Sequence, residues 1–373
     1  MNGKKVDLMS DNMDKKELTE TAETQRIILP DPTRLILSPS PHIQTGPGTG
    51  KIILLVIACL APAIVASLMF FGLHALRVLV ITTASCAAFE YLWNRISGRK
   101  STLNDFSAIL TGLLLAMNTS SLTPAWVCVA GAFIAIIIAK QIYGGLGQNP
   151  FNPAAVARIA MLTGAAGAMT RFPAPNSIFF APIPDALTMA TPLGAAESFS
   201  AMGKGVEYFN SSAFLWRAFI GETSGSLGET SALAILIGGI GLIALRIIRW
   251  HIPVSIICTV AVFVSLVNHF SPGTTPGVLF HLLSGGLLLG AFFMATDMVT
   301  SPVTVKGGIV FGIGIGILVC VIRIYGSYPE GMSFAIVLMN ALVPLIDRFC
   351  YIHPFGHQNI KSGRIEPRRG EIR

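Results

Sequence analysis

The sequence predicts an all-α integral membrane protein of about ten transmembrane helices, in two halves joined by a long loop outside the cytoplasm. Three observations support this fold class. Of the 373 residues, 52% are hydrophobic and 12% are charged, with a mean hydropathy of +0.66, whereas about a quarter of a soluble domain is charged. Apolar stretches long enough to cross a membrane recur along the chain. Lysine and arginine gather in alternate connections between these stretches.

The composition divides the chain into five segments. A polar segment of mixed charge, 1–50, precedes the first apolar stretch, and a basic tail, 351–373, ends the chain. The two membrane halves are expected at 51–167 and 230–350. The polar connection between them, 168–229, is expected outside the cytoplasm. Because a connection this long usually has a function, the first search for a site belongs there.

About five apolar windows of transmembrane length precede this loop and about five follow it. Several are shortened by glycine or proline. The third and fifth are the shortest, so whether they cross the membrane completely stays open. The expected spans are 52–73, 78–92, 106–117, 125–142, 153–166, 232–244, 252–267, 278–295, 308–322 and 332–346.

The charges of the connections predict the orientation. The short outer connections hold only Arg77 and Arg323. This positive-inside pattern places both termini in the cytoplasm and the long loop outside a bacterial cytoplasmic membrane. It also accounts for the net charge of +7 and the pI near 9.2 without a nucleic-acid partner. The inner connections hold Arg95, Arg99, Lys100, Lys140, Arg246, Arg249 and Lys306.

The two halves resemble each other. Residues 110–124 read L-T-G-L-L-L-A-M-N-T-S-S-L-T-P, and residues 283–302 read L-S-G-G-L-L-L-G-A-F-F-M-A-T-D-M-V-T-S-P. Because an odd number of spans in each half inserts the second half upside down, we expect two inverted five-helix repeats. Proteins built in this way place functional sites near the repeat interface, often at interrupted helices. Chance similarity between two leucine-rich helices is the alternative.

The cysteines indicate neither a metal site nor an iron–sulfur site. They are scattered through apolar segments, with no C-x-x-C and no Cys/His pair at metal-ligand spacing. Packing in the core is the expected use. The six are Cys59, Cys86, Cys128, Cys258, Cys320 and Cys350.

A glycine-rich stretch, G-G-L-G-Q-N-P-F-N-P-A-A-V-A-R, begins at Gly144. Gly144, Gly145 and the prolines interrupt a helix, and irregular backbone at membrane depth is tolerated only where it is buried in protein or lines a cavity. Asn149 and Asn152 offer hydrogen bonds to a flavin or an ion, and a packed helix break is the alternative. Arg158 is an intramembrane charge, which needs a partner and is a functional candidate.

A second candidate lies at the cytoplasmic end of the eighth span. Asp297 and Thr300, in A-T-D-M-V-T-S-P, supply a carboxylate and a hydroxyl, which are ligand types for a coupling cation. A contact confined to the helix end is the alternative.

The long loop contains D-A-L-T-M-A-T-P-L. Asp185, Thr188, Ala190 and Thr191 have the spacing D-x-x-T-x-A-T, which resembles the flavinylation motif of membrane flavoproteins in the Rnf and sodium-pumping NADH:quinone reductase complexes. The resemblance implies that Thr191 carries FMN through a phosphoester bond made by a separate flavin transferase. Met189 stands where the usual motif has glycine. A surface turn at Thr-Pro is the alternative interpretation.

Four further stretches resemble the same family, in its order along the chain. On these stretches the chain is identified as a member of the NqrB/RnfD family, with the S-P-H start typical of the RnfD side of that family. The stretches are S-P-H at 40–42, the glycine-rich segment at 144–158, A-F-F-M-A-T-D-M-V-T-S-P at 291–302 and Y-P-E-G-M-S-F-A-I-V-L-M-N at 328–340.

The resemblance implies a flavoprotein subunit of a translocase, with no complete activity alone. It would pass electrons within a ferredoxin:NAD+ oxidoreductase coupled to Na+ or H+ movement. The implied cofactors are FMN on Thr191 and, as a candidate, a non-covalent riboflavin that no residue here places. The implied partners are iron–sulfur subunits, a second flavinylated subunit, the transferase and membrane lipid. Two alternatives stay open, an NqrB-like subunit of the sodium-pumping NADH:quinone reductase and a non-redox transporter or channel.

Overall fold

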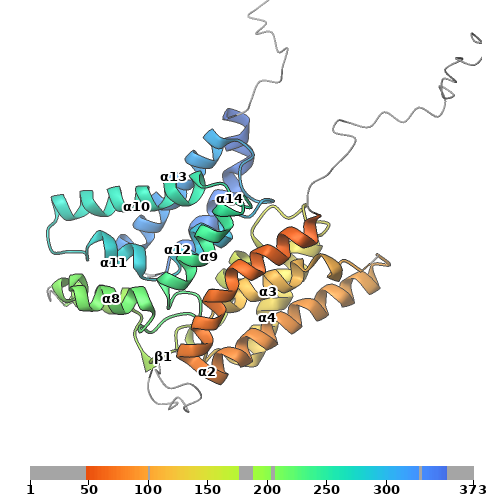
Figure 1. Cartoon of the computed structure of the whole chain (residues 1–373), viewed down its shortest axis with the longest axis horizontal. Helices are drawn as coiled ribbons and strands as arrows, with labels where there is room; N and C mark the ends of the chain where they lie inside the picture. The colour runs from red at the N-terminus through yellow and green to blue at the C-terminus, as the bar shows by residue number, and fades with distance from the viewer. Residues whose placement is uncertain (1–47, 100, 176–187, 203–205, 327–329, 351–373) are drawn as a thin grey trace, which may run out of the picture. The chain divides into compact units, whose positions relative to one another are not determined.

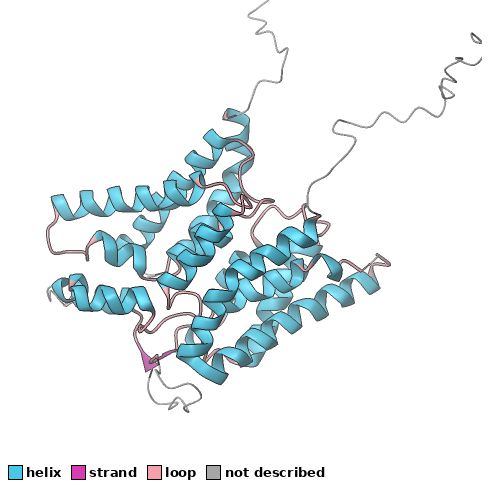
Figure 2. Ribbon diagram, in the orientation of Figure 1, coloured by secondary structure: helices cyan, strands magenta, loops and turns pink. Residues whose placement is uncertain are grey.

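The computed structural model describes residues 48–99, 101–175, 188–202, 206–326 and 330–350 (Figure 1). These residues are mostly helical, with one short pair of strands (Figure 2). The S-P-H stretch, most of the segment 1–50, the tail 351–373 and Asp185 lie outside the described residues.

Four described helices are long and apolar enough to cross a membrane: α2 (Thr49–Ile96), α10 (His251–Phe270), α13 (Val305–Tyr325) and α14 (Met332–Phe349). Shorter apolar helices accompany them. This confirms the predicted class, a helical membrane protein, whereas the number of spans and their inversion stay predictions. The shorter helices are α3 (Ser107–Met117), α4 (Ala125–Phe133) continuing into η3 (Ile134–Gln141), α5 (Pro153–Gly164) and α9 (Ala232–Ala244).

The first two expected spans form one helical element, α2, which is sharply broken at Gly72. Gly72 has φ 56° and ψ −135°, a conformation that side-chain-bearing residues rarely adopt, so the glycine turns the chain between two helical limbs (Figure 1). The connection expected at 74–77 is therefore wrong. Arg77, counted there, lies within α2 and donates to the Thr123 carbonyl oxygen (3.3 Å).

The eighth expected span, 278–295, is not one continuous helix. It consists of α11 (Val278–Leu283), α12 (Leu287–Leu289) and η5 (Gly290–Met294), a π-helical turn. Gly285, with φ +71°, lies in the break between α11 and α12. The residues of α12 and η5 are buried, which is the setting in which irregular backbone is tolerated at membrane depth.

The helices pack into one main core. Helix α2 packs against α3, α4 and α9, while α10 packs on α13 and α13 on α14. Helix α5 contacts α3, η3 and α14, so it links the two halves of the chain. The fully buried side chains of Leu115, Met117, Leu289, Phe311 and Ile336 belong to this core.

The described part of the long loop folds against the second half. Strand β1 (Phe172–Pro173) pairs antiparallel with β2 (Thr188–Met189). A small separate core includes Leu193, Phe209 and Phe280, and the rings of Phe209 and Phe280 are 5.4 Å apart. Since Phe280 belongs to α11, this core fixes the loop to that helix. The other loop elements are α6 (Ala166–Met169), α7 (Pro192–Ala201), η4 (Val206–Asn210) and α8 (Ser212–Ile220).

Candidate functional site

Thr191 is the N-cap residue of α7. Its backbone is extended, and its Oγ1 accepts a hydrogen bond from the Gly194 backbone N–H (3.2 Å). The local sequence explains this start, because threonine satisfies an amide that has no partner within the helix and Pro192 has no N–H to satisfy. The Thr191 side chain is 7% exposed. The motif threonine thus lies at a buried helix N-terminus.

Two anchors hold the backbone next to Thr191. The Ser224 hydroxyl donates to the Ala190 carbonyl oxygen (2.6 Å), and β2 pairs with β1 immediately before it. Next to β1, the Ser120 hydroxyl donates to the Arg171 carbonyl oxygen (2.5 Å). Residues from both halves therefore fix the two ends of this strand pair.

The motif residues are only partly described. Ala190 and Thr191 are placed, Thr188 is described as backbone of β2, and Asp185 lies outside the described residues. Met189, at the position where the usual motif has glycine, is 54% exposed. Its bulk therefore points to the surface and does not fill the space around Thr191.

The N-terminus of α7 suits an esterified phosphate. Unpaired N–H groups and the helix dipole favour negative charge at such an end, and α7 is ten residues long. A phosphoester on Thr191 Oγ1 would lie at this end, beside the Gly194 N–H that the hydroxyl already contacts. The chain's residues thus fit an FMN phosphate at this position.

Arg158 lies in a buried ionic cluster at the centre of the described structure. It extends from α5, and its Nη2 lies 3.3 Å from Glu229 Oε1 and also forms an ion pair with Glu330. Its Nη1 donates to the Asn118 carbonyl oxygen. The partner that an intramembrane arginine requires is therefore a pair of carboxylates. Glu229, beside α9, and Glu330, beside α14, were both missed in the sequence.

Asn152 joins the glycine-rich segment to the broken helix. Its Oδ1 accepts from the Ala154 and Ala155 N–H groups, which caps α5, while its Nδ2 donates to the Met294 carbonyl oxygen (3.1 Å). Asn340, with its amide oriented to satisfy both ends, accepts from the Asn152 N–H (3.0 Å). The segment therefore contacts η5 and α14 of the second half through hydrogen bonds.

Asp297 and Thr300 do come together. Thr300 Oγ1 donates to Asp297 Oδ2, and the Val299 N–H donates to Asp297 Oδ1, both at 3.3 Å. These are contacts within one turn, as the helix-end alternative expected. Thr300 also contributes its carbonyl oxygen to the bridge with Asn340 (3.2 Å).

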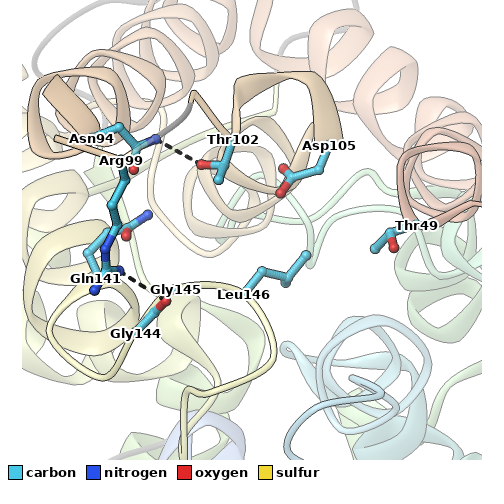
Figure 3. A pocket seen from close by; sticks show the side chains of 9 residues that line it. All are labelled: Thr49, Asn94, Arg99, Thr102, Asp105, Gln141, Gly144, Gly145 and Leu146. Atoms are coloured by element: carbon cyan, nitrogen blue, oxygen red, sulfur yellow. Dashed lines mark hydrogen bonds between the residues drawn. The ribbon is translucent and has the colours of Figure 1, made fainter. Parts of the chain in front are cut away.

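Gly144 and Gly145 line a cavity of about 290 Å³, apart from the contacts of Arg158 (Figure 3). Both have positive φ, 124° and 100°, which favours glycine. Arg99 donates to the Gly144 carbonyl oxygen (3.2 Å) across one side. Asn149 Nδ2 donates to the Phe151 carbonyl oxygen (3.1 Å). The broken-helix candidates therefore belong to more than one site. The cavity is lined by Thr49, Asn94, Arg99, Thr102, Asp105, Gln141, Gly144, Gly145 and Leu146.

Next to this cavity lies a buried ion pair that the sequence reasoning missed. Lys140 Nζ, from η3, is 2.7 Å from Glu90 Oε2 and donates to Ser107 Oγ (2.6 Å). The Thr102 hydroxyl donates to Glu90 Oε1 (2.6 Å). Lys140 was counted as a charge of an inner connection, and that assignment is wrong because its side chain is buried. The signal was a single charge within an apolar run, F-E-Y-L-W for Glu90 and I-I-I-A-K for Lys140.

Arg323, counted as an outer connection charge, is also buried within a helix, α13. Its Nη1 donates to the His281 carbonyl oxygen (2.7 Å) and its Nη2 to the Ser284 carbonyl oxygen (3.2 Å). Arg323 therefore holds the broken end of α11 against α13.

Curated proteins similar to this chain are D components of ion-translocating complexes. The one from the ion-translocating oxidoreductase complex of Stutzerimonas stutzeri is 44% identical over 324 residues, 82% of this chain and 92% of the relative. The one from the proton-translocating ferredoxin:NAD(+) oxidoreductase complex of Clostridium ljungdahlii is 42% identical over 321 residues, 86% and 96% of the two chains. The one from the Na(+)-translocating ferredoxin:NAD(+) oxidoreductase complex of Acetobacterium woodii is 42% identical over 330 residues, 88% and 97% of the two chains.

The family comparison covers nearly the same part of the chain. Residues 36–356 match the NQR2, RnfD, RnfE family, a range that includes both membrane halves and the Thr191 motif. With this match and relatives above 40% identity over most of their length, the chain belongs to the NQR2, RnfD, RnfE family.

Proposed function

We propose that this chain is the membrane-embedded electron-transfer subunit of an Rnf-type ferredoxin:NAD+ oxidoreductase coupled to translocation of Na+ or H+. The names of the relatives support the complex, and the D-x-x-T-x-A-T motif supports the flavin. The observation that carries the proposal is the placement of Thr191 at a buried helix N-terminus suited to a phosphoester.

Attachment requires a separate flavin transferase with FAD as co-substrate, because an unaided threonine hydroxyl is a poor nucleophile. Thr191 Oγ1 forms a bond to the phosphorus of the FMN half of FAD. The P–O bond of the pyrophosphate breaks and AMP leaves, while the hydroxyl proton passes to a base of the transferase. No electrons are transferred in this step.

Bound FMN supplies the electron-transfer chemistry. The chain's own residues hold and orient it: the N-terminus of α7 binds the phosphate, and the β1–β2 pair with Ser224 fixes the backbone beside Thr191. A covalent bond at Thr191 prevents dissociation and keeps a high local concentration at one place. Electrons are exchanged with partner subunits, which include iron–sulfur subunits and a second flavinylated subunit.

The proposed topology has about ten helices in two inverted halves, with both termini in the cytoplasm. The loop that contains Thr191 then lies outside the cytoplasmic membrane, where the transferase acts. The charges of the exposed connections support this orientation, with Arg95, Arg99, Arg249 and Lys306 on the inner side.

The test is flavin fluorescence of the protein band in a denaturing gel after co-expression with a flavin transferase. We expect fluorescence in the wild type and none in Thr191→Ala. The matched control is Thr304→Ala, since Thr304 caps α13 in the same way and its Oγ1 accepts from the Gly307 N–H (3.0 Å). A dark wild-type band, with the transferase active on another substrate, would contradict the proposal. A fluorescent Thr191→Ala band would move the attachment to another residue.

The same complex separates the two redox alternatives. An Rnf-type complex should exchange electrons between ferredoxin and NAD+, whereas the NqrB-like alternative requires quinone reduction by NADH. The assay is performed on the intact complex purified with this protein. Quinone reduction that keeps pace with NADH oxidation would favour the NqrB-like alternative.

A further inference from the structure

A group of buried polar atoms lies where α11, α13 and the start of α7 meet. His281 Nε2, Ser284 Oγ and Arg323 Nε have no hydrogen-bond partner among the described residues, and all three side chains are buried. Nearly all buried polar side-chain atoms in proteins are hydrogen-bonded. Three unbonded ones on adjoining helices therefore indicate a place prepared for a polar ligand.

Arg323 gives this place a positive charge. Its guanidinium contacts only two neutral carbonyl oxygens, those of His281 and Ser284, and the ion pairs among the described residues do not include it. The nearest carboxylate by electrostatic effect is Glu229, which already pairs with Arg158. A buried guanidinium held in this way is suited to bind an anion through its free N–H.

Gly285 separates Arg323 from the first turn of α7. A Cβ at this position would lie 2.6 Å from Leu193 Cδ1 and 2.8 Å from Arg323 Nη2. With its φ of +71° the residue also favours glycine. The guanidinium and the helix start that Thr191 caps therefore approach each other across a residue without a side chain.

We propose that Arg323, with Ser284, binds the phosphate of the flavin carried by Thr191 and so positions the cofactor against α11. This inference rests on the proposed flavin attachment, which it deepens by naming the residues that receive the phosphate. The ligand class is a phosphate ester. The helix N-terminus binds it from one side and the guanidinium and the Ser284 hydroxyl bind it from the other.

The experiment compares FMN with riboflavin, which lacks the phosphate. The full-length chain is purified in detergent from a host without a flavin transferase, and dissociation constants are measured by quenching of flavin fluorescence. We expect FMN to bind at least about tenfold more tightly than riboflavin to the wild type. Arg323→Gln should lower this ratio to about one and leave riboflavin affinity unchanged.

Two further variants keep the inference falsifiable. Arg217→Gln is the matched control, because Arg217 is an exposed arginine on α8, and it should keep the wild-type ratio. Ser284→Ala removes a hydroxyl that has no bond to lose, so the chain should fold even if Arg323→Gln does not. It should lower the ratio about threefold.

Three results would overturn the inference. The first is equal binding of FMN and riboflavin, or no binding of FMN, by the wild type. The second is equal weakening of both ligands in Arg323→Gln together with an unchanged ratio in Ser284→Ala, which indicates a purely structural role. The third is the same loss in Arg217→Gln. None of these depends on the gel assay, so covalent flavin at Thr191 can be established while the role of Arg323 is rejected.

Discussion

Charged side chains buried among the helices occur with partners of opposite charge. Lys140 pairs with Glu90, and Arg158 pairs with Glu229 and Glu330. Removing such groups from water costs several kcal/mol each, and the attraction between them offsets this cost only when their remaining hydrogen bonds are also made. Hydroxyls from Thr102 and Ser107 supply those bonds around the first pair.

The Lys140–Glu90 pair predicts a specific stability pattern. Lys140→Met should destabilise the chain by about 3–5 kcal/mol, because it leaves Glu90 buried without a partner. The double variant Lys140→Met/Glu90→Gln should recover most of this loss, since no buried charge remains. The measurement is the unfolding midpoint in mixed detergent, with exposed Lys306→Met as the control. A single variant as stable as the control would show that the pair does not exist in the membrane.

At the scale of elements, close packing between α10 and α13 depends on glycines spaced four residues apart. A Cβ at Gly312 would overlap Ser255 Oγ and lie 3.0 Å from the Ile252 carbonyl oxygen. Gly308 and Gly316 also face α10, against His251 and Thr259. Small residues at this spacing allow helix backbones to approach closely in membranes, where packing drives association.

This packing predicts different costs for two glycines of α13. Gly312→Ala should destabilise the chain by about 1–3 kcal/mol, because the backbone of α10 cannot yield. Gly314→Ala should cost less, since its Cβ would meet only the flexible side chain of Met339. Thermal midpoints in detergent compare the two variants. Equal costs would mean that α10 and α13 do not approach as described.

At the scale of the whole molecule, the proposed topology fixes the side on which each connection lies. Introduced cysteines at Arg217 (Arg217→Cys) and Lys306 (Lys306→Cys) are both expected to be reachable by a label, because both positions are exposed. A membrane-impermeant maleimide should label Arg217→Cys in intact spheroplasts and Lys306→Cys only after permeabilisation. The parent chain, with its six cysteines, supplies the background. The reverse labelling order would invert the topology and place Thr191 in the cytoplasm.

Overall similarity does not determine which ion moves. The relatives from Clostridium ljungdahlii and Acetobacterium woodii are both 42% identical to this chain, and their names carry a proton and a sodium ion, respectively. The choice of ion must therefore rest on few positions within the complex. Residue pairs such as Lys140–Glu90 and Asp297–Thr300 are the places in this chain to compare.

Sequence alone was sufficient for the helical membrane class, the family and the Thr191 motif. These depend on local information, namely hydropathy over about twenty residues and short motifs in a fixed order. It could not show that Gly72 replaces a loop, because a chain break of this kind depends on one backbone conformation.

Only the tertiary structure decided which charges are buried and what they contact. Lys140 lies 50 residues from Glu90 and Arg158 lies 71 residues from Glu229, so no local pattern could pair them. Lys140 and Arg323 were counted among connection charges, yet packing of the surrounding helices buries both. The approach of Arg323 to the helix start at Thr191 likewise depends on the break at Gly285, where a missing side chain lets the loop and α13 come together.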